Sequence, residues 1–453
     1  MFRYKINSIM KTTISAERQK IQIVDFRQQI YTHLNQRRDA QFELVDALLQ
    51  SRWVDSLAEL SLAPSFRREW SSVYSALEDG EQERDKLHKL CLRQIPYREI
   101  EYFVIDGSSV RRSSSPTLED RGYVQSATHD VGSKGIVVGH EHSILAWTEK
   151  THSSWSLPVH IKRIATNTEA VTVASEQIKW LCENAPKQSR CRVSLDGKYG
   201  NTHFFALNID RKDCDLMARL RKDRVMYQVP SGYQGRGRPP IYGEAFRFKD
   251  PETWHQTDET IELDDERYGR VKLQLWRALR FEYGHKIVEI AVLRASIHTE
   301  KEKPPEPRWY GWHGSETASA EEIWRTFHYR WPVEPSIRFR KQHLHWQLPQ
   351  TRTIEASERW TMLVSLAQWQ LYLARDLVSH CRLPWQKELT NLTPARVRQS
   401  LDSIFPTIGT PASEPQTRGK SLGWPKGKAR AKPTRYKVIK KDPKSKKKPK
   451  QAV

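Results

Sequence analysis

The spacing of hydrophobic positions in this chain changes near residue 100. Before that point, residues 40–49 and 54–62 carry apolar side chains every three or four positions, as amphipathic helices do. Pro64 separates them from a further helix expected at 65–77. Residues 1–95 are therefore predicted to form a helical module.

Beyond residue 100 the pattern becomes that of strands. The apolar run 102–105 is typical of a strand buried on both faces, and it is expected to end at Asp106-Gly107. The order strand, strand, strand, helix, strand predicts a mixed sheet whose crossover helix places the first and fourth strands side by side. The later elements of this unit are strands at 135–150 and 155–164, a helix at 168–184 and a strand at 191–195 that stops at Asp196-Gly197.

The rest of the chain extends this α/β pattern. Residues 215–227 are expected to add a strand, 270–297 alternate as β-structure does, and 358–377 form a long apolar-faced helix over the sheet. Beyond about residue 405, Pro, Gly, Ser and Lys dominate and disorder is expected. The predicted domains are a helical domain at 1–95, a core at 96–229 and 306–400, a β-rich insertion at 230–305 that closes over the site, and a disordered basic tail at 401–453.

One short segment combines a carboxylate with several cations. Pro332 and Pro335 suit a first helical turn, so a helix is expected from about Glu334 to residue 346. Glu334, Arg338 and Lys341 then share one face at i, i+4 and i+7. Such a face can bind a phosphodiester, with the carboxylate holding a divalent metal and the cations holding phosphates. The alternative is an amphipathic helix with an internal ion pair.

Two Asp-Gly pairs follow predicted strands. Either pair, Asp106-Gly107 or Asp196-Gly197, can be an ordinary hairpin turn. Neither, however, is followed by a return strand in the pattern. Two carboxylates at the ends of neighbouring strands are placed to bind cations together.

The charge of the chain indicates a polyanionic partner. The formal net charge is +21, and residues 418–450 contribute +14 of it, from 15 Lys or Arg and the single acid Asp442. A run such as 444–450 is typical of a solvated arm that adds sequence-independent affinity for nucleic acid. The basic helical module either binds DNA or packs on its neighbour. Some of the 16 Trp would stack on bases, although core packing explains most.

Several classes of protein are excluded by composition. A mean hydropathy of −0.73 and the lack of a long apolar run argue against a membrane span or a signal peptide. The five cysteines are scattered without a CxxC pair, so neither a disulfide framework nor a zinc knuckle is expected. The pairs His140/His142 and His343/His345 lack further ligands at metal-site spacing and are interpreted as structural or DNA-facing. A cytoplasmic, nucleoid-associated location is expected.

A short basic motif lies in the expected insertion. Arg236, Gly237, Arg238 and Pro239 match the core of an AT-hook, whose arginines enter the minor groove of A·T tracts. An ordinary basic loop is the alternative.

The three acids and their neighbours resemble a known family. Asp106 in Tyr-Phe-Val-Ile-Asp-Gly, Asp196 in Val-Ser-Leu-Asp-Gly-Lys-Tyr-Gly and Glu334 in Tyr-Arg-Trp-Pro-Val-Glu are similar to the acidic triad of DDE insertion-sequence transposases, which have an RNase H-like core. The resemblance covers about residues 100–380 and extends to the subgroup with the signature Tyr-x2-Arg-x3-Glu-x6-Lys. Arg330, Glu334 and Lys341 match it, whereas Phe327 stands at the Tyr position.

The resemblance implies a transposase that cleaves insertion-sequence ends and joins them to target DNA. Asp106, Asp196 and Glu334 would hold two Mg²⁺ ions, for which Mn²⁺ can substitute, and these would activate water or a DNA 3′-hydroxyl. Arg330 and Lys341 would hold phosphates. The partners would be double-stranded DNA, as terminal inverted repeats and target, and a second copy of the chain. Relatives stack a flipped base on Trp, and Trp276 is the candidate here.

Two other functions remain open at this point. One is an inactive or domesticated DNA-binding protein that keeps the fold, against which the intact acids argue. The other is an RNase H-like nuclease of different specificity, such as a junction resolvase, against which the long insertion and the Arg330-to-Lys341 spacing argue.

Overall fold

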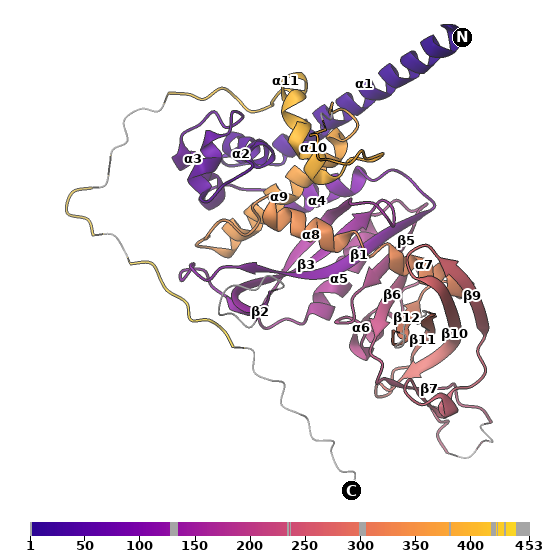
Figure 1. Ribbon diagram of the computed structural model, residues 1–453. Helices are drawn as coiled ribbons and strands as arrows, with labels where there is room; N and C mark the ends of the chain where they lie inside the picture. The colour runs from indigo at the N-terminus through magenta and orange to yellow at the C-terminus, as the bar shows by residue number, and fades with distance from the viewer. Residues whose placement is uncertain are drawn as a thin grey trace.

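The computed structural model describes residues 2–126, 135–232, 235, 237–298, 305–379, 382–417, 423, 425–429 and 432–440. Within these residues one mixed sheet runs through the α/β fold, and helices flank it (Figure 1). The strands are β1 (Ile100–Arg111), β2 (Gly122–Gln125), β3 (Ile136–Thr148), β4 (Ser156–Ile164), β5 (Arg190–Leu195), β6 (Cys214–Leu220), β7 (Val225–Tyr227), β8 (Ala245–Arg247), β9 (Glu259–Asp265), β10 (Gly269–Phe281), β11 (Val288–Ile297) and β12 (Arg308–His313).

The helices gather mainly at the two faces of the β1–β5 part of the sheet. No helix among the described residues is both long enough and apolar enough to cross a membrane. The α-helices are α1 (Phe2–Thr32), α2 (Arg38–Gln50), α3 (Trp70–Glu78), α4 (Arg84–Arg93), α5 (Ala170–Asn184), α6 (Thr202–Asn208), α7 (Ala320–His328), α8 (Val333–Gln342), α9 (Ile354–Ala374), α10 (Pro394–Ser400) and α11 (Phe405–Ile408), and 3-10 turns occupy Leu57–Leu62, Pro251–Thr253 and Leu401–Ser403.

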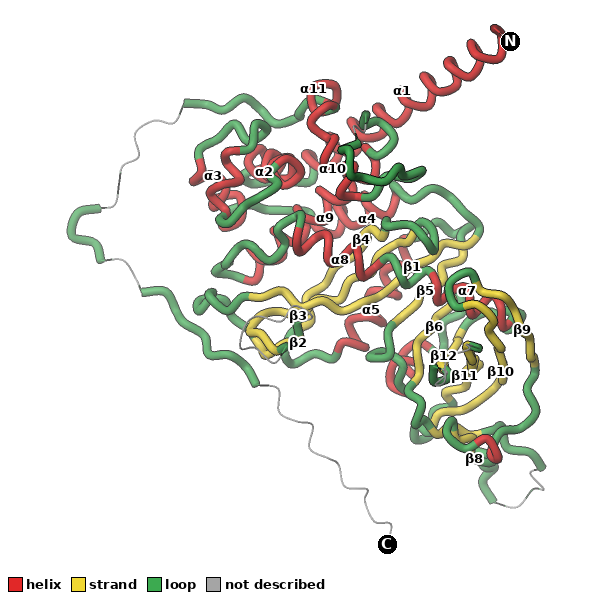
Figure 2. Tube along the Cα trace, viewed as in Figure 1, coloured by secondary structure: helices red, strands yellow, loops and turns green. Residues whose placement is uncertain are grey.

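The order of strands across the sheet is β2-β3-β1-β5-β6-β12-β11-β10-β7-β8, with β4 paired to β3 and β9 paired to β10. As predicted, the first and fourth strands of the core, β1 and β5, are parallel neighbours, with Ile105 opposite Leu195. A crossover helix, α5, connects β4 to β5 and packs against β3 and β4. Figure 2 shows the strands in yellow as one continuous layer that curves at β9 to β11.

The expected end of the first strand at Asp106-Gly107 is wrong. β1 continues to Arg111 because β3 pairs with it antiparallel over its whole second half, from Asp106 opposite Ile144 to Arg111 opposite Gly139. Asp106 therefore lies inside a strand, and the hairpin-turn alternative does not apply to it. Asp196, by contrast, follows directly after the last residue of β5, as expected.

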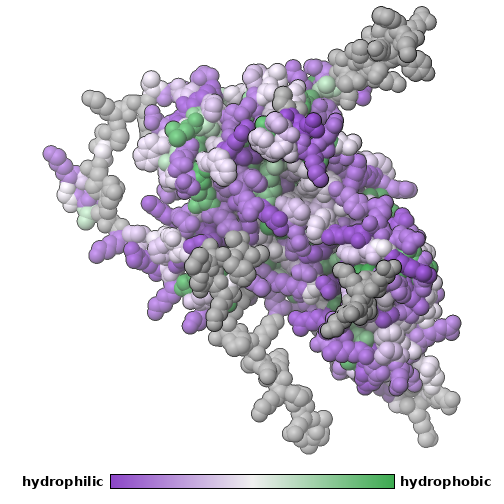
Figure 3. Space-filling model, in the orientation of Figure 1, coloured by the Kyte–Doolittle hydropathy of each residue, from purple (hydrophilic) through white to green (hydrophobic). Residues whose placement is uncertain are grey.

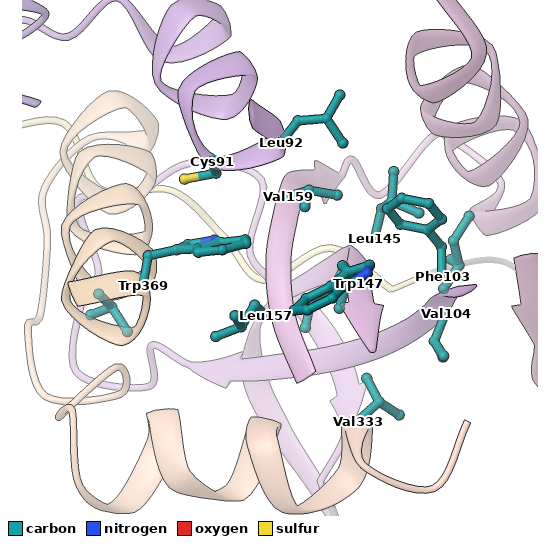
Figure 4. Close-up of a cluster of buried hydrophobic side chains, with 14 of the residues drawn as sticks. Cys91, Leu92, Phe103, Val104, Leu145, Trp147, Leu157, Val159, Val333 and Trp369 are labelled. Atoms are coloured by element: carbon teal, nitrogen blue, oxygen red, sulfur yellow. The ribbon is translucent and has the colours of Figure 1, made fainter. Parts of the chain in front are cut away.

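A continuous core joins the helical layer to the sheet. Figure 4 shows Val333 of α8 and Trp369 of α9 directed at the sheet, where Trp147 and Leu157 lie. These four side chains are almost completely buried. The long helix predicted at 358–377 is α9, shifted to Ile354–Ala374, and it packs on β4 and on the N-terminal helices. Hydrophilic side chains cover most of the face drawn in Figure 3.

The expected β-rich insertion extends the central sheet. β12 pairs antiparallel with β6 on one side and with β11 on the other, so the backbone ladder runs from the core into β9, β10 and β11 without a break. The strands of the insertion expected to close over the site are thus continuous with the strands that carry the acids.

Segments from the N-terminal and C-terminal parts of the chain, α1 and α11, pack together in the helical layer. Arg27 of α1 forms a buried ion pair with Asp46 of α2. The segment after 401 was predicted to be disordered, but Ile404, Ile408 and Ala412 are buried on this layer because they supply apolar side chains to it. Further along, the amide of Ile439 donates to the carbonyl of Arg121. The lysine run at 444–450 lies outside the described residues.

Candidate active site

The three acids singled out in the sequence converge on one guanidinium group. Arg330 Nη2 lies 3.4 Å from Asp106 Oδ2 and 3.9 Å from Asp196 Oδ2, and Arg330 Nη1 lies 3.4 Å from Glu334 Oε1. Two of these carboxylates thus approach the same nitrogen atom. Acids separated by 90 and 138 positions in the sequence are brought within reach of a single cation.

Three elements hold this arrangement. In β1, every second residue lies on the same face of the strand, and one face carries Tyr102, Val104 and Asp106. The ring of Tyr329 stacks on Tyr102 with centroids 3.5 Å apart, and this contact fixes the residue that precedes Arg330. α8 then begins at Val333 and packs on β1, and Glu334, in its first turn, reaches Arg330.

The carboxylates differ in their exposure. The side chain of Asp106 is 13% exposed, whereas those of Asp196 and Glu334 are 46% and 54% exposed. Burial raises the pKa of Asp106 above its ordinary value, and the nearby Asp196 and Glu334 raise it further, while Arg330 and the amide of Gly107 lower it. Arg330 therefore offsets part of the cost of burying this carboxylate.

The donor set fits a hard divalent cation. The three side chains offer carboxylate oxygens only, and the two half-exposed acids leave room for retained water, as small divalent cations require. In this arrangement the Arg330 guanidinium supplies the positive charge that keeps three mutually repelling acids together. Asp106, Asp196 and Glu334 are the residues that would hold the metal.

Two further predicted residues extend along α8. Lys341 is partly buried, and desolvation together with Arg340 lowers its pKa to about 8, although Asp106 opposes this shift. Arg338 is exposed on the same helix. Both lie on the helix that carries Glu334, and Lys341 is close enough for Asp106 to influence its pKa.

Basic side chains flank the acids on both sides. A hollow of about 750 Å³ beside Asp196 is lined by Lys198, Arg221 and Lys249. A smaller hollow of about 180 Å³ beside Glu334 is lined by Arg267 and His152. Arg219 of β6 and Arg308 of β12 line both hollows. The sequence did not single out these two arginines, because only the β6–β12 pairing brings their strands together.

Trp276 is not placed for base stacking. Its side chain is 1% exposed, its Nε1 donates to the carbonyl of His255 at 3.0 Å, and Phe246 and Trp309 pack on its ring. The prediction failed because side chains from other strands cover this face of the sheet too. A residue on the face that alternation would leave exposed is therefore buried. Trp331, next to Arg330, is 47% exposed and lies under the guanidinium of Arg267 at 3.8 Å.

The remaining candidates lie elsewhere. Arg236 lies outside the described residues, and Arg238 is exposed in the loop between β7 and β8. Phe327, at the Tyr position of the signature, packs on Tyr310 in the core. Of the histidines considered above as metal ligands, His140 and His345 each contact a backbone carbonyl at 3.0 Å, as expected of structural residues.

Comparison with family models identifies a family. A family model described as DDE superfamily endonuclease matches residues 29–280. The matched segment contains Asp106 and Asp196, whereas Glu334 lies beyond its end. No curated protein matches the chain.

Proposed function

We propose that this chain, which belongs to the DDE superfamily of endonucleases, is a transposase that cleaves DNA at insertion-sequence ends and joins them to target DNA. The family assigns a DNA substrate and divalent metal chemistry. The finer proposal includes two Mg²⁺ ions, for which Mn²⁺ can substitute, membership of the subgroup with the Tyr-x2-Arg-x3-Glu-x6-Lys signature, a homodimer on DNA and association with the nucleoid.

The observation that carries this proposal is the meeting of Asp106, Asp196 and Glu334 around Arg330. Salt bridges on a protein surface are common, but three acids around one arginine, with one of the acids largely buried, carry a desolvation cost that stability alone does not explain. A site for phosphoryl transfer does need concentrated negative charge to hold metal beside positive charge to hold phosphate.

Different side chains would bind the metal and the DNA. Bound divalent metal would supply a Lewis acid and a deprotonated nucleophile at neutral pH. Asp106, the most buried of the three acids, would hold the metal together with the more exposed Asp196 and Glu334. Beside metal-bound acids the Arg330 guanidinium would be free to bind a phosphate oxygen, for which its fork geometry is suited.

The two basic hollows provide a path for the DNA backbone. Arg219 and Arg308 border both, so cations continue from the side of Asp196 to the side of Glu334. Phosphate contacts of this kind set the register of a duplex without reading its sequence. The scissile phosphate would thus lie over the acids, with its flanking phosphates held on β6 and β12.

The test is an assay of the purified chain on a duplex that carries the inverted repeats flanking its gene. Strand cleavage and joining to a second duplex, both dependent on divalent metal, are expected. Binding of the ends without nicking under any metal would instead identify an inactive DNA-binding protein. Cleavage of branched junctions in preference to ends would identify a nuclease of another specificity.

A pH dependence is expected from Lys341. Because its pKa is lowered to about 8, the free protein loses this charge as the pH rises through that value, and affinity for end DNA should fall there. Lys341→Arg should keep its affinity over the same range, since arginine stays charged. Lys341→Gln should bind weakly at every pH. Gel-shift titrations at constant salt measure this, and an equal pH profile for wild type and Lys341→Arg would contradict it.

Trp276 and Trp331 should respond oppositely to replacement by alanine. Trp276→Ala removes a buried ring and is expected to lower the free energy of unfolding by about 3–5 kcal/mol. Trp331→Ala should leave stability within about 0.5 kcal/mol but weaken binding of cleaved or distorted ends by about 1–3 kcal/mol if the ring stacks on a base. Denaturant unfolding and gel shifts measure the two effects, and unchanged binding by Trp331→Ala would refute its contact with DNA.

A further inference from the structure

A group of thiols lies at the end of the sheet opposite the acids. Cys182 is near the end of α5, Cys191 is the second residue of β5, and Cys214 begins β6. Cys191 and Cys214 are direct partners in the parallel β5–β6 pair. Asp196 follows the other end of β5, about 17 Å away along an extended strand. These cysteines therefore belong to a location separate from the active site.

Three donor atoms in this group have the spacing of a metal site. The Sγ atoms of Cys182 and Cys214 and a carboxylate oxygen of Asp213 all lie within 4.8 Å of one another. Two sulfur ligands on a tetrahedral zinc ion are about 3.8 Å apart, given Zn–S bonds of about 2.3 Å. Shifts of about 1 Å or less, which a side-chain rotation supplies, would bring these atoms to ligand distance.

The surroundings of the group favour metal binding over a simple core contact. Cys214 is fully buried, but Cys182 is only partly buried and Asp213 is exposed, so an ion can enter from solvent. The carboxylate of Asp213 lies 3.8 Å from Arg211, a loose ion pair that leaves Asp213 available. The three cysteines are free thiols rather than disulfides.

We propose that Cys182, Cys214 and Asp213 bind one zinc ion, with water in the fourth position, and that this ion ties the end of α5 to the start of β6. Binding displaces the two thiol protons to solvent and involves no redox change. Soft thiolate ligands select zinc here, whereas the all-oxygen set around Arg330 selects a hard cation. The two sites are thus chemically distinct within one sheet.

The experiment measures metal content and stability in the full-length chain. Protein purified without chelator and dialysed against metal-free buffer is expected to retain one equivalent of zinc and to melt at a higher temperature than zinc-stripped protein. Cobalt added to stripped protein should give a thiolate-to-metal charge-transfer band. This band reports sulfur ligation in the wild-type chain, so the test does not depend on any variant folding.

Matched variants locate the ion. Cys182→Ala, Cys214→Ala and Asp213→Asn should each weaken zinc retention and reduce the zinc-dependent rise in melting temperature. Cys91→Ala removes another buried thiol, on α4, and should leave both unchanged. Asp106→Asn should also retain zinc. Absence of the cobalt band, or zinc retention unaffected by loss of Cys182 and Cys214, would overturn the proposal.

Discussion

Asp106→Asn is expected to reduce metal-dependent cleavage of an end-bearing duplex by at least about 10³-fold, because a bound metal contributes several kcal/mol to the transition state and each 1.36 kcal/mol is tenfold in rate. Asp196→Asn and Glu334→Gln should have comparable effects, since all three acids meet at one point. DNA binding should persist or strengthen, because each change removes negative charge beside the phosphates.

The matched control is Asp210→Asn, an equal change of charge at an exposed acid that is paired with Lys286 away from the site. It should cleave at the wild-type rate. Single-turnover cleavage and gel shifts on the same duplex separate chemistry from binding. Retained cutting by any one of the three acid variants would refute the assignment of the active site.

Arg330→Ala is expected to lower cleavage by about 10²–10³-fold, the cost of removing one preorganised charge donor from a reacting phosphate. A second effect acts through Asp106, whose pKa Arg330 lowers. Without the guanidinium, that pKa rises, and a higher pH is needed to ionise the carboxyl group for metal binding. The pH midpoint of metal-dependent cleavage should therefore move upward, and the metal concentration needed at neutral pH should increase.

Rate profiles against pH at fixed metal concentration measure this shift. Arg330→Lys should reverse part of this alkaline displacement, because it restores the charge, but it should recover less of the maximal rate, because it lacks the fork of donors. Arg325→Ala, at an exposed arginine of α7 paired with Glu321, is the control and should keep the wild-type profile. A reduced rate with an unmoved midpoint would show that Arg330 acts on phosphate alone.

The local pattern of the chain was a reliable guide where side-chain periodicity decides the structure. The strands β3, β4 and β5 and the helix α5 lie within a few residues of their predicted ranges. Their apolar positions alternate or recur in a way that only one element type can bury. The end of β1 was misplaced because a strand continues for as long as a partner offers backbone hydrogen bonds, and the partner β3 is remote in sequence.

Burial of individual side chains was harder to foresee. In the sequence, Trp276 is an aromatic residue in a basic strand, as a base-stacking residue would be. In the structure, Phe246 and Trp309 from other strands cover its ring. Arg219 and Arg308 look like ordinary strand cations until β6 and β12 pair. In each case the deciding contact joins segments that are far apart in the chain.

The sequence by itself determined which side chains can do chemistry: three spaced acids, an arginine and a lysine at fixed intervals, and a fold of alternating strands and helices. The tertiary structure alone decided that the three acids share Arg330 and that Cys182, Asp213 and Cys214 adjoin. Periodicity specifies only which face of an element is buried, whereas the neighbours of that face are set by strand pairing and helix packing across the whole molecule.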